Sequence, residues 1–338
     1  MATIYDIAKE CGISPATVSK ALSNATDVSA ATRDRVRRVA AEMNYVPDAR
    51  AKSLSRNRSW SIGVLCQDGS EMGLRHYLFA AIIESFKSSI EKLGYDMCIL
   101  SNQVGNTGLS YLGHCRYRKL DGVFIVNADH ESPDFLELVE SDLPKIAFDY
   151  PYDNASCITT DTAKGMKMLY DYLWQLGHRD IVYFHGDKRR FITMQRINAL
   201  KDAAAAHGVT MDNKAFVPSA YYSITAGRDS MHALFREGHK PSAVICSDDY
   251  SAVGALNAIR AAGMSVPEDI SLCGYDGIEI TQLAYPQLTT IRQNTELIGQ
   301  KAAEGLVAQI NTPPRSRVPA HIVIEPELII GKSCSPAR

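Results

Sequence analysis

The first 22 residues constrain this chain most strongly, because they predict two short helices joined by a tight turn. Apolar side chains recur at helical spacing over residues 3–10. Gly12 can take the left-handed backbone conformation that a close helix corner needs. Ser14 is placed to cap a second helix over residues 15–22. The pair predicts a helix-turn-helix, whose second helix can enter a DNA major groove, although an ordinary core can also contain such a corner.

A third helix is predicted to complete an all-α N-terminal domain over residues 1–46. It covers residues 30–43, with Ser29 as its cap. Its apolar side chains recur at helical spacing and would close a small core: Val36, Val39, Ala40 and Met43. The helix must end before Pro47, because the residue that precedes a proline avoids the helical conformation.

Five short motifs in this segment form a specific combination. They are Thr-Ile-Tyr-Asp-Ile-Ala at 3–8, Gly-Ile-Ser at 12–14, Thr-Val-Ser at 17–19, Val-Ser at 28–29 and Asn-Tyr-Val-Pro at 44–47. With these motifs the segment resembles the lactose-repressor/galactose-repressor (LacI/GalR) family of bacterial transcription regulators. The resemblance implies a sequence-specific DNA-binding transcriptional regulator, specifically a repressor, and not an enzyme. It also implies double-stranded operator DNA as a partner, read by a homodimer with one half-site for each head.

The outward face of the second helix carries side chains that suit base contacts. Pro15 and Ala16 offer apolar contact to a thymine methyl group, and Lys20 can donate to guanine. The head residues expected to contact DNA are Thr3, Tyr5, Ser14, Pro15, Ala16, Thr17, Ser19, Lys20 and Asn24.

The charge distribution supports a nucleic-acid partner although the total charge does not. The whole chain carries a formal charge of −2, but residues 1–58 hold ten Lys and Arg against six Asp and Glu, which leaves +4 there and −6 in the remainder. A basic head on an acidic body directs the head toward phosphates. A merely solvated surface is the alternative explanation.

Residues 47–59 are polar and basic, with Leu54 as their one large apolar side chain. A lone helix of this length is marginal in water, so we expect it to fold when two copies meet on DNA. The resemblance implies a hinge helix in the minor groove with Leu54 wedged between base pairs. Packing of Leu54 on its own domain is the alternative. The hinge residues expected to contact DNA are Arg50, Lys52, Leu54 and Arg56, with Arg58 as a further phosphate contact.

From Trp60 onward, short apolar segments alternate with amphipathic helices. Strands are expected over residues 61–66, 96–100, 122–126, 145–148, 181–185, 243–246 and 271–275, and helices over 77–93, 163–176, 193–207, 225–237, 250–262 and 295–310. This alternation is typical of parallel sheets with βαβ crossovers. The chain has no G-x-G-x-x-G or Walker A sequence, which argues against a nucleotide site.

The body also resembles the regulatory core of the same family, which is similar to a periplasmic sugar-binding protein. The matching motifs are Leu-Gly-His-Arg at 176–179, Ser-Asp-Asp at 247–249, Val-Pro-Glu-Asp-Ile-Ser at 266–271, Gly-Tyr-Asp at 274–276 and Leu-Thr-Thr-Ile-Arg-Gln at 288–293. The resemblance implies an effector-binding and dimerisation core over residues 60–338 with two α/β lobes. Lobe 1 is expected at about 60–160 and 290–322, and lobe 2 at about 161–289 and 323–331, with three chain crossings between them. The heptad tail of tetrameric relatives is not seen after residue 331, so the expectation is a dimer.

A ligand of such a core is expected at the carboxyl ends of its strands, between the lobes. Carboxylates, amides and a guanidinium can hold sugar hydroxyls, and an aromatic ring can cover a sugar face. The family resemblance therefore implies a small carbohydrate-like effector contacted by Asn127, Asp149, Arg196, Tyr222, Asp248 and Asp276. The strand-end rule adds Gln67 as a further contact. Asp249 is expected to cap the following helix. Arg75 and His76, in a loop unlike that of many relatives, could recognise an anionic sugar or simply begin a helix.

The eight cysteines form no C-x-x-C pair and no zinc spacing, so we expect reduced thiols, a cytoplasmic location and neither a metal nor a cofactor. No apolar segment approaches the length of a membrane span, and no signal peptide precedes Thr3. Two rival functions are a transport receptor and an enzyme. The basic head disfavours the receptor, and adjacent Asp248 and Asp249 would point apart, which disfavours paired acid–base chemistry.

Overall fold

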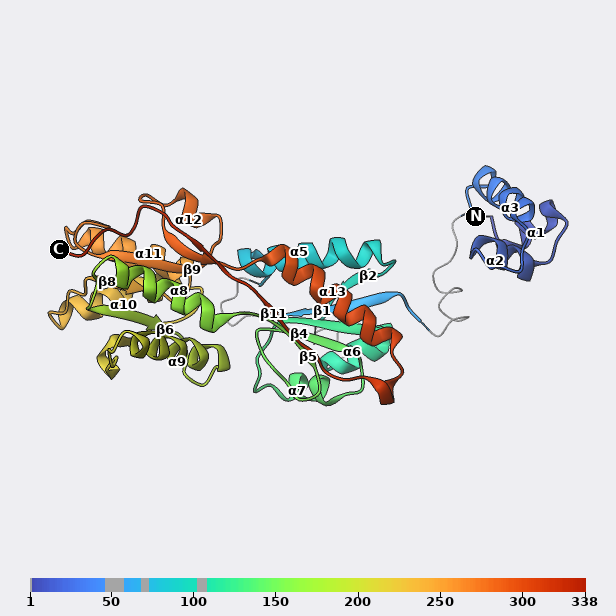
Figure 1. The fold of residues 1–338 in the computed structure, drawn as a ribbon. Helices are drawn as coiled ribbons and strands as arrows, with labels where there is room; N and C mark the ends of the chain where they lie inside the picture. Colours follow the sequence, from blue (N-terminus) through green and yellow to red (C-terminus); the bar gives the residue numbers. More distant parts are fainter. Residues whose placement is uncertain (1, 46–57, 68–72, 102–107) are drawn as a thin grey trace. The chain divides into compact units, whose positions relative to one another are not determined.

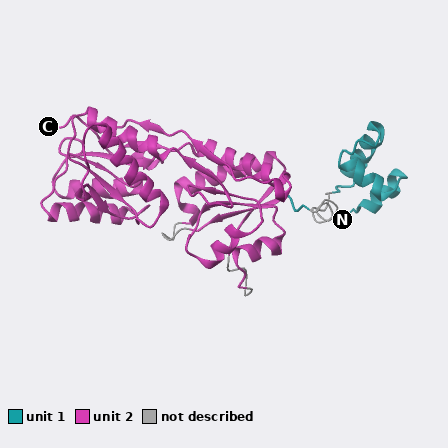
Figure 2. Cartoon of the chain, turned by 60° about the horizontal axis from the view of Figure 1, so that its bottom comes forward, with its two compact units in different colours: residues 1–60 teal, residues 61–338 magenta. Residues whose placement is uncertain are grey.

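The computed structural model describes residues 2–45, 58–67, 73–101 and 108–338. The chain divides into two compact units, residues 1–60 and residues 61–338 (Figure 2). None of the helices in the described ranges has the length and apolar character needed to cross a membrane.

The first unit contains three helices, α1 (Ile4–Cys11), α2 (Pro15–Leu22) and α3 (Ala30–Glu42). Helices α2 and α3 begin as the sequence predicts, whereas α1 begins at Ile4, one residue after the predicted start, because Thr3 is its N-cap. Thr3 and Asp6 form a reciprocal capping box on α1, and the hydroxyls of Ser14 and Ser29 accept from backbone N–H groups of α2 and α3. Gly12 turns the chain between α1 and α2 at a φ of +61°. The small core of this unit contains Ile7, Ala8, Cys11, Val18, Ala21, Val28, Val36, Val39 and Ala40.

Lobe 1 of the second unit is a parallel sheet with the strand order β11-β5-β4-β3-β1-β2 (Figure 1). Its strands are β1 (Ser61–Cys66), β2 (Asp96–Ile99), β3 (Gly122–Asn127), β4 (Lys145–Phe148), β5 (Ser156–Thr160) and β11 (His321–Ile324). Helices α5 (Tyr77–Lys92) and α13 (Thr295–Asn311) cover one face, and α6 (Tyr111–Arg118) and α7 (Pro133–Glu140) cover the other. Because both faces are covered, β3 and β4 are almost wholly apolar rather than alternating.

Lobe 2 repeats this architecture with the order β12-β10-β9-β8-β6-β7. Its strands are β6 (Ile181–His185), β7 (Phe216–Pro218), β8 (Ala243–Ile245), β9 (Ser271–Asp276), β10 (Thr289–Arg292) and β12 (Glu327–Ile329). Only β12 is antiparallel to its neighbour. The helices are α8 (Thr162–Gln175), α9 (Phe191–Ala206), α10 (Ile224–Arg236), α11 (Asp249–Ala261) and the short α12 (Ile280–Leu283).

The chain passes between the lobes after β5, after β10 and after β11, which are the three crossings expected. The expected lobe boundaries were wrong by a few residues at two of them. Residues 290–292 lie in lobe 2, because β10 pairs with β9, and residues 323–324 lie in lobe 1, because β11 pairs with β5. Strand pairing, rather than the local sequence, therefore decides where each crossing begins.

Candidate DNA-contacting head and ligand cleft

Helix α2 presents a small-sided polar face. Ala16, Ser19 and Lys20 are exposed, whereas Val18 and Ala21 are buried against the other helices. The Lys20 Nζ atom donates to Asp27 Oδ2 at 2.5 Å, and both side chains are more than half exposed. An ion pair in that setting is weak, so a DNA phosphate or base can replace it.

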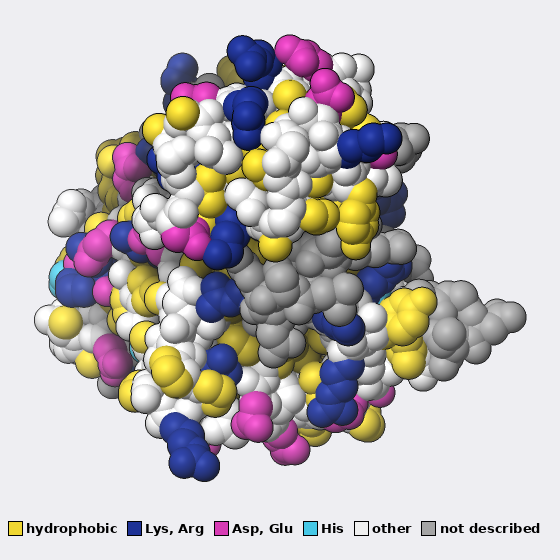
Figure 3. All heavy atoms as spheres, turned by 90° about the vertical axis from the view of Figure 1, so that its right-hand side faces the viewer, with side chains coloured by type: hydrophobic (Ala, Val, Ile, Leu, Met, Phe, Trp, Pro, Cys, Tyr) yellow, Lys and Arg dark blue, Asp and Glu magenta, His cyan; other side chains and the backbone are white. Residues whose placement is uncertain are grey.

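The nine predicted head contacts are accessible to different degrees. Thr3, Tyr5, Ser14, Ala16, Ser19, Lys20 and Asn24 are exposed, and Pro15 and Thr17 are half-buried. Asn24 Oδ1 accepts from Arg37. The predicted hinge contacts Arg50, Lys52, Leu54 and Arg56 lie outside the described residues. On the face shown in Figure 3, Lys and Arg side chains are spread among neutral and apolar ones rather than gathered in a single block. All these DNA contacts therefore stay predictions.

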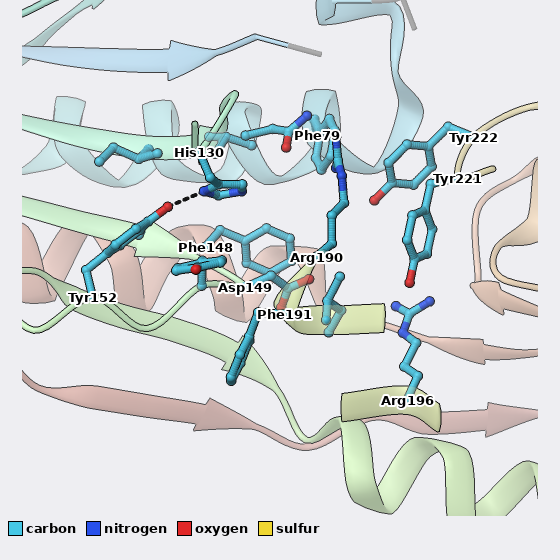
Figure 4. A pocket seen from close by; sticks show the side chains of 16 residues that line it. Phe79, His130, Phe148, Asp149, Tyr152, Arg190, Phe191, Arg196, Tyr221 and Tyr222 are labelled. Carbon is cyan, nitrogen blue, oxygen red and sulfur yellow. Dashed lines mark hydrogen bonds between the residues drawn. The ribbon is translucent and has the colours of Figure 1, made fainter. Parts of the chain in front are cut away.

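An inner cavity of about 50 Å³ lies between the lobes of the second unit (Figure 4). Lobe 1 contributes Asn127 at the end of β3 and Asp149 after β4, and lobe 2 contributes Arg196 of α9 and Tyr222. These four of the seven predicted effector contacts therefore meet in one place. The remaining lining residues are mostly apolar or aromatic: Phe79, Ile125, Val126, His130, Ala147, Phe148, Tyr150, Tyr152, Arg190, Phe191, Ile192 and Tyr221.

Asp149 contributes an unsatisfied acceptor to this cavity. Its backbone has a φ of +59°, and its Oδ1 atom is buried without a hydrogen-bond partner among the described residues. Burial raises the pKa of Asp149 to about 6, against the opposing effects of the Arg196 charge and a hydrogen bond from the Thr160 backbone. The group is therefore mostly ionised at neutral pH and neutral in mild acid.

Arg196 contributes an unsatisfied donor. The residue is only 4% exposed, its Nη1 donates to the Ser247 carbonyl at 2.6 Å, and its guanidinium carbon lies 3.7 Å from the centre of the Tyr275 ring. Its Nε atom has no partner in the described part of the chain. The stacking and the single backbone bond hold the guanidinium in place while one N–H remains available.

An outer cavity of about 390 Å³ continues from the inner one and shares His130, Tyr150 and Arg190 with it. Gln67, a predicted contact, lines this outer cavity, where its Oε1 atom accepts from the Tyr111 hydroxyl at 2.6 Å. The cleft is therefore aromatic inside and polar outside.

Asp248 and Asp276, the two other predicted contacts, line neither cavity. Asp248 is the cap of α11, and its carboxylate accepts from the backbone N–H groups of Tyr222 and Ser251 at 2.8 and 2.9 Å. The prediction that Asp249 caps this helix was therefore wrong by one residue. Asp249 points away, between strands, and accepts from the Thr290 hydroxyl at 2.6 Å.

Asp276 is 4% exposed and lies behind the cavity wall at a φ of +104°. Burial raises its pKa to about 8, although the nearby Arg196 charge acts in the opposite direction. The side chain accepts from Gln293 Nε2 at 2.7 Å. A direct effector contact by Asp248 or Asp276 stays a prediction that would need a rearrangement of these bonds.

Several contacts join the lobes beside the cleft. His76 caps α5, as the helix-start alternative expected, and its ring lies 4.1 Å from that of Tyr222 in an edge-on arrangement. Tyr77 donates to Glu279 Oε2 at 2.5 Å across the two lobes. Arg75 is exposed and lines neither cavity. These contacts hold the lobes close together.

The aromatic character of the cleft and one of its arginines were not predicted from the sequence. His130 stacks on Tyr150 at 4.4 Å, and burial lowers the pKa of His130 to about 4, with the Arg190 charge adding to the effect. His130, Tyr150 and Arg190 follow β3, β4 and β6, so the strand-end rule could have found them. Within the described ranges no group of three His, Cys, Asp or Glu side chains could hold a metal ion, and none of the eight cysteines forms a disulfide.

Comparison with known proteins places the chain in a family. Residues 3–48 match the model for bacterial regulatory proteins of the lacI family, and residues 170–334 match a periplasmic binding protein-like domain. The chain is 31% identical to the HTH-type transcriptional repressor PurR of Pectobacterium atrosepticum, over 98% of this chain and 97% of that protein. The chain belongs to the LacI family.

Further LacI-family relatives cover almost the same length. The chain is 29% identical to the probable HTH-type transcriptional repressor ExuR of Bacillus subtilis, over 93% of each protein. A crystal structure of the lac repressor dimer bound to operator and the anti-inducer ONPF has the same fold, with a TM-score of 0.81, 24% identity and coverage of 99% of both chains. A structure of the CelR–cellobiose complex has a TM-score of 0.72 at 24% identity, over 98% of this chain and 100% of that one.

LacI-family membership establishes the chain as a DNA-binding transcriptional regulator with a two-lobed periplasmic-binding-like core. It also settles the choice against an enzyme, because the family consists of regulators.

Proposed function

We propose that this LacI-family protein is a homodimeric repressor whose hold on operator DNA is controlled by a carbohydrate-like effector bound between the lobes of residues 61–338. One observation carries the proposal. A buried acceptor, Asp149 Oδ1, and a buried donor, Arg196 Nε, belong to residues that line the same interlobe cavity, and neither atom has a partner in the described part of the chain. Buried polar groups are normally satisfied, so the pair calls for a ligand with both donors and acceptors.

Sugar hydroxyls meet this requirement, since each both donates and accepts. The rings of Phe79, Phe148 and Tyr222 offer apolar surfaces for the faces of a sugar. Relatives support the same class of ligand. One is named ribose operon repressor in Haemophilus influenzae, and the CelR structure contains cellobiose.

The size of the inner cavity indicates how an effector would act. About 50 Å³ holds one or two water molecules, whereas ligand pockets are usually about 300–1,000 Å³. A sugar that reaches Asp149 and Arg196 must therefore move the lobes or their aromatic side chains. An effector that favours one arrangement of the lobes shifts the protein toward it, and couplings of about 1–3 kcal/mol are typical of such allostery.

The head carries the DNA part of the proposal. We infer that α2 of each head reads one half-site of a near-palindromic operator, with Ala16, Ser19 and Lys20 toward the bases. The dimer in the lac repressor structure supports the same assembly here. A regulator that acts on bacterial DNA and carries eight free thiols fits the cytoplasm.

The test uses the full-length protein and a duplex that it selects from a random pool. Sugars, sugar phosphates and nucleosides are screened for their effect on the affinity for this duplex and on the melting temperature, because a ligand of the native state raises that temperature. We expect at least one carbohydrate to change the affinity by about tenfold or more.

Variants then locate the ligand. Asp149→Asn and Arg196→Ala should abolish the response to the ligand, whereas Arg228→Ala, at an exposed position of α10, should keep it. Asp149→Asn is nearly isosteric and guards against loss of folding. A response that persists in both cleft variants would overturn the assignment of the site.

A further inference from the structure

The charges that line the inner cavity are unbalanced. They comprise two guanidiniums, of Arg190 and Arg196, and one carboxylate, of Asp149. His130 does not add to them, because burial holds its pKa at about 4 and leaves the ring neutral at physiological pH. Arg196 has Asp149 and Asp276 among the groups that act on it electrostatically. Arg190, by contrast, forms no ion pair with a carboxylate in the described part of the chain, although the charge of Asp187 acts on it.

Arg190 differs from its neighbour in the chain. Arg189 is 75% exposed and donates to Asp187 Oδ2 at 2.6 Å, with Glu131 Oε2 at 3.8 Å. Arg190 is half-buried, lines both cavities, and its side chain makes neither a hydrogen bond nor an ion pair with any described residue. Of the carboxylates that line the outer cavity, Asp187 and Glu131 lie against Arg189, and Asp129 Oδ1 accepts from the Glu131 backbone N–H at 3.1 Å. None of them pairs directly with the guanidinium of Arg190, which remains for a ligand.

The backbone adds a second feature at the same place. Arg190 is the N-cap of the 16-residue helix α9, and unlike Ser, Thr, Asp or Asn at that position it supplies no side-chain acceptor. Phe191 and Ile192, the first two helical residues, line the inner cavity, and their N–H groups have no acceptor among the described residues. The positive end of a helix dipole therefore faces the cleft, and such ends favour anions.

A third, independent observation points to a ligand here. Arg196, from the second turn of α9, is 4% exposed, lines the same cavity and has an Nε atom without a hydrogen-bond partner among the described residues. Figure 4 shows both arginine side chains among the aromatic rings of the cleft. Two guanidiniums and the first two backbone N–H groups of one helix thus belong to residues that line one cavity. All of them are donors, and none is an acceptor.

We propose that the effector carries an acidic group, a carboxylate or a phosphate, which Arg190 and the first N–H groups of α9 bind. The inference rests on the proposed function and narrows its ligand from carbohydrates to acidic sugars. Asp149, on the lobe 1 side, remains to accept from the hydroxyls of the same molecule. Arg190 then determines the preference for an acidic over a neutral sugar, and Arg196 can donate to both the acidic group and the hydroxyls.

The test compares matched ligands on the full-length protein. Each hexuronate and each hexose 6-phosphate is paired with its neutral hexose, and dissociation constants are measured by calorimetry at fixed ionic strength. We expect an acidic member of one pair to bind about ten- to a hundredfold more tightly than the hexose, since charge-assisted bonds are the stronger ones. The acid with the lower dissociation constant, uronate or phosphate, shows whether the acidic group is a carboxylate or a phosphate.

Two variants of adjacent residues then assign the contact. Arg190→Gln should reduce the preference for the acid over the neutral hexose to less than about threefold. Arg189→Gln removes an exposed charge next to it and should keep the preference, which controls for the general field of the cleft.

The outcomes separate this inference from the proposed function. Equal binding of acid and hexose, or binding of hexoses alone, would overturn the acidic ligand. A preference that survives Arg190→Gln would overturn its binding by Arg190. Each of these results leaves the carbohydrate effector standing. If no member of any pair binds, the acidic ligand fails, and the carbohydrate effector fails with it only if the wider screen of sugars, sugar phosphates and nucleosides also gives no response.

Discussion

The side chain of Gln293 donates a hydrogen bond from Nε2 to Oδ1 of Asp276 at 2.7 Å, while its Oε1 accepts from the Thr160 hydroxyl at 2.5 Å. Thr160 ends β5 in lobe 1, Asp276 ends β9 in lobe 2, and Gln293 follows β10 where the chain crosses between them. All three side chains are buried. The Gln293 side chain therefore links the end of β5 in lobe 1 to Asp276 in lobe 2. A change in the protonation of Asp276 alters one of these two hydrogen bonds and so acts directly on the connection between the lobes.

Stability should depend on pH through Asp276. Burial raises its folded pKa from 3.8 to about 8, so the folded protein holds this proton more tightly than the unfolded chain. The stabilisation is complete below about pH 4 and is lost as the pH rises through 8. Each tenfold difference in proton affinity between the two states corresponds to about 1.4 kcal/mol. We expect Asp276→Asn to flatten the decline in the free energy of unfolding between pH 5 and 9, measured in urea, whereas Asp202→Asn on the exposed face of α9 leaves it unchanged. If the free energy of unfolding falls equally with pH in wild type and Asp276→Asn, the raised pKa of Asp276 is contradicted.

Tyr77→Phe should make the effector bind more tightly. The Tyr77 hydroxyl donates to Glu279 across the lobes, and this bond favours the arrangement in which the inner cavity is only about 50 Å³. Its loss favours opening, and for a half-exposed bond we expect about a two- to fivefold lower dissociation constant. Tyr285→Phe, at a residue that is 81% exposed, is the control. An unchanged or weaker affinity for Tyr77→Phe would show that this bond does not restrain the lobes.

Two glycines of α13 should respond oppositely to alanine. A Cβ at Gly299 would lie 2.5 Å from the Phe86 backbone nitrogen, because α13 and α5 are in close contact there. A Cβ at Gly305 would meet only side-chain methyl groups at 3.3 Å or more. Thermal unfolding should show Gly299→Ala destabilised by at least about 2 kcal/mol through overpacking. Gly305→Ala should be neutral or stabilised by up to about 1 kcal/mol, because alanine has the higher helix propensity. Similar effects at both positions would refute this difference in packing.

The DNA-facing role of α2 can be tested with paired substitutions. Ala16 and Ala31 are both exposed and both occupy the second position of a helix, in α2 and α3. Glutamate is tolerated at both positions, because acidic residues stabilise a helix N-terminus. In a titration of the selected duplex, Ala16→Glu should bind at least about tenfold more weakly, whereas Ala31→Glu should bind within about threefold of wild type. Equal losses would indicate that charge alone, and not the α2 face, governs binding.

Much of the fold could be predicted because its signals are local. Capping by Ser14 and Ser29 and the positive φ of Gly12 depend on side chains within three residues, and the structure has each of them. The strands of the two lobes are short apolar segments that the sequence shows directly. The lobe boundaries at β10 and β11 were misplaced because strand pairing joins residues more than a hundred positions apart in the case of β11 and β5.

The candidate site was only partly predictable, because it too depends on contacts between residues that are far apart in the sequence. Strand ends marked Asn127, Asp149 and Gln67, but which of two adjacent carboxylates caps α11 depends on Tyr222 and Thr290, which come from other loops and strands. The sequence by itself determined the helix-turn-helix, the alternation of strands and helices and the family, since these follow from spacing along the chain. Only the tertiary structure decided that Arg190 stays unpaired beside Arg196 while Arg189 is neutralised, because burial and charge pairing among the described residues are properties of neighbours in space.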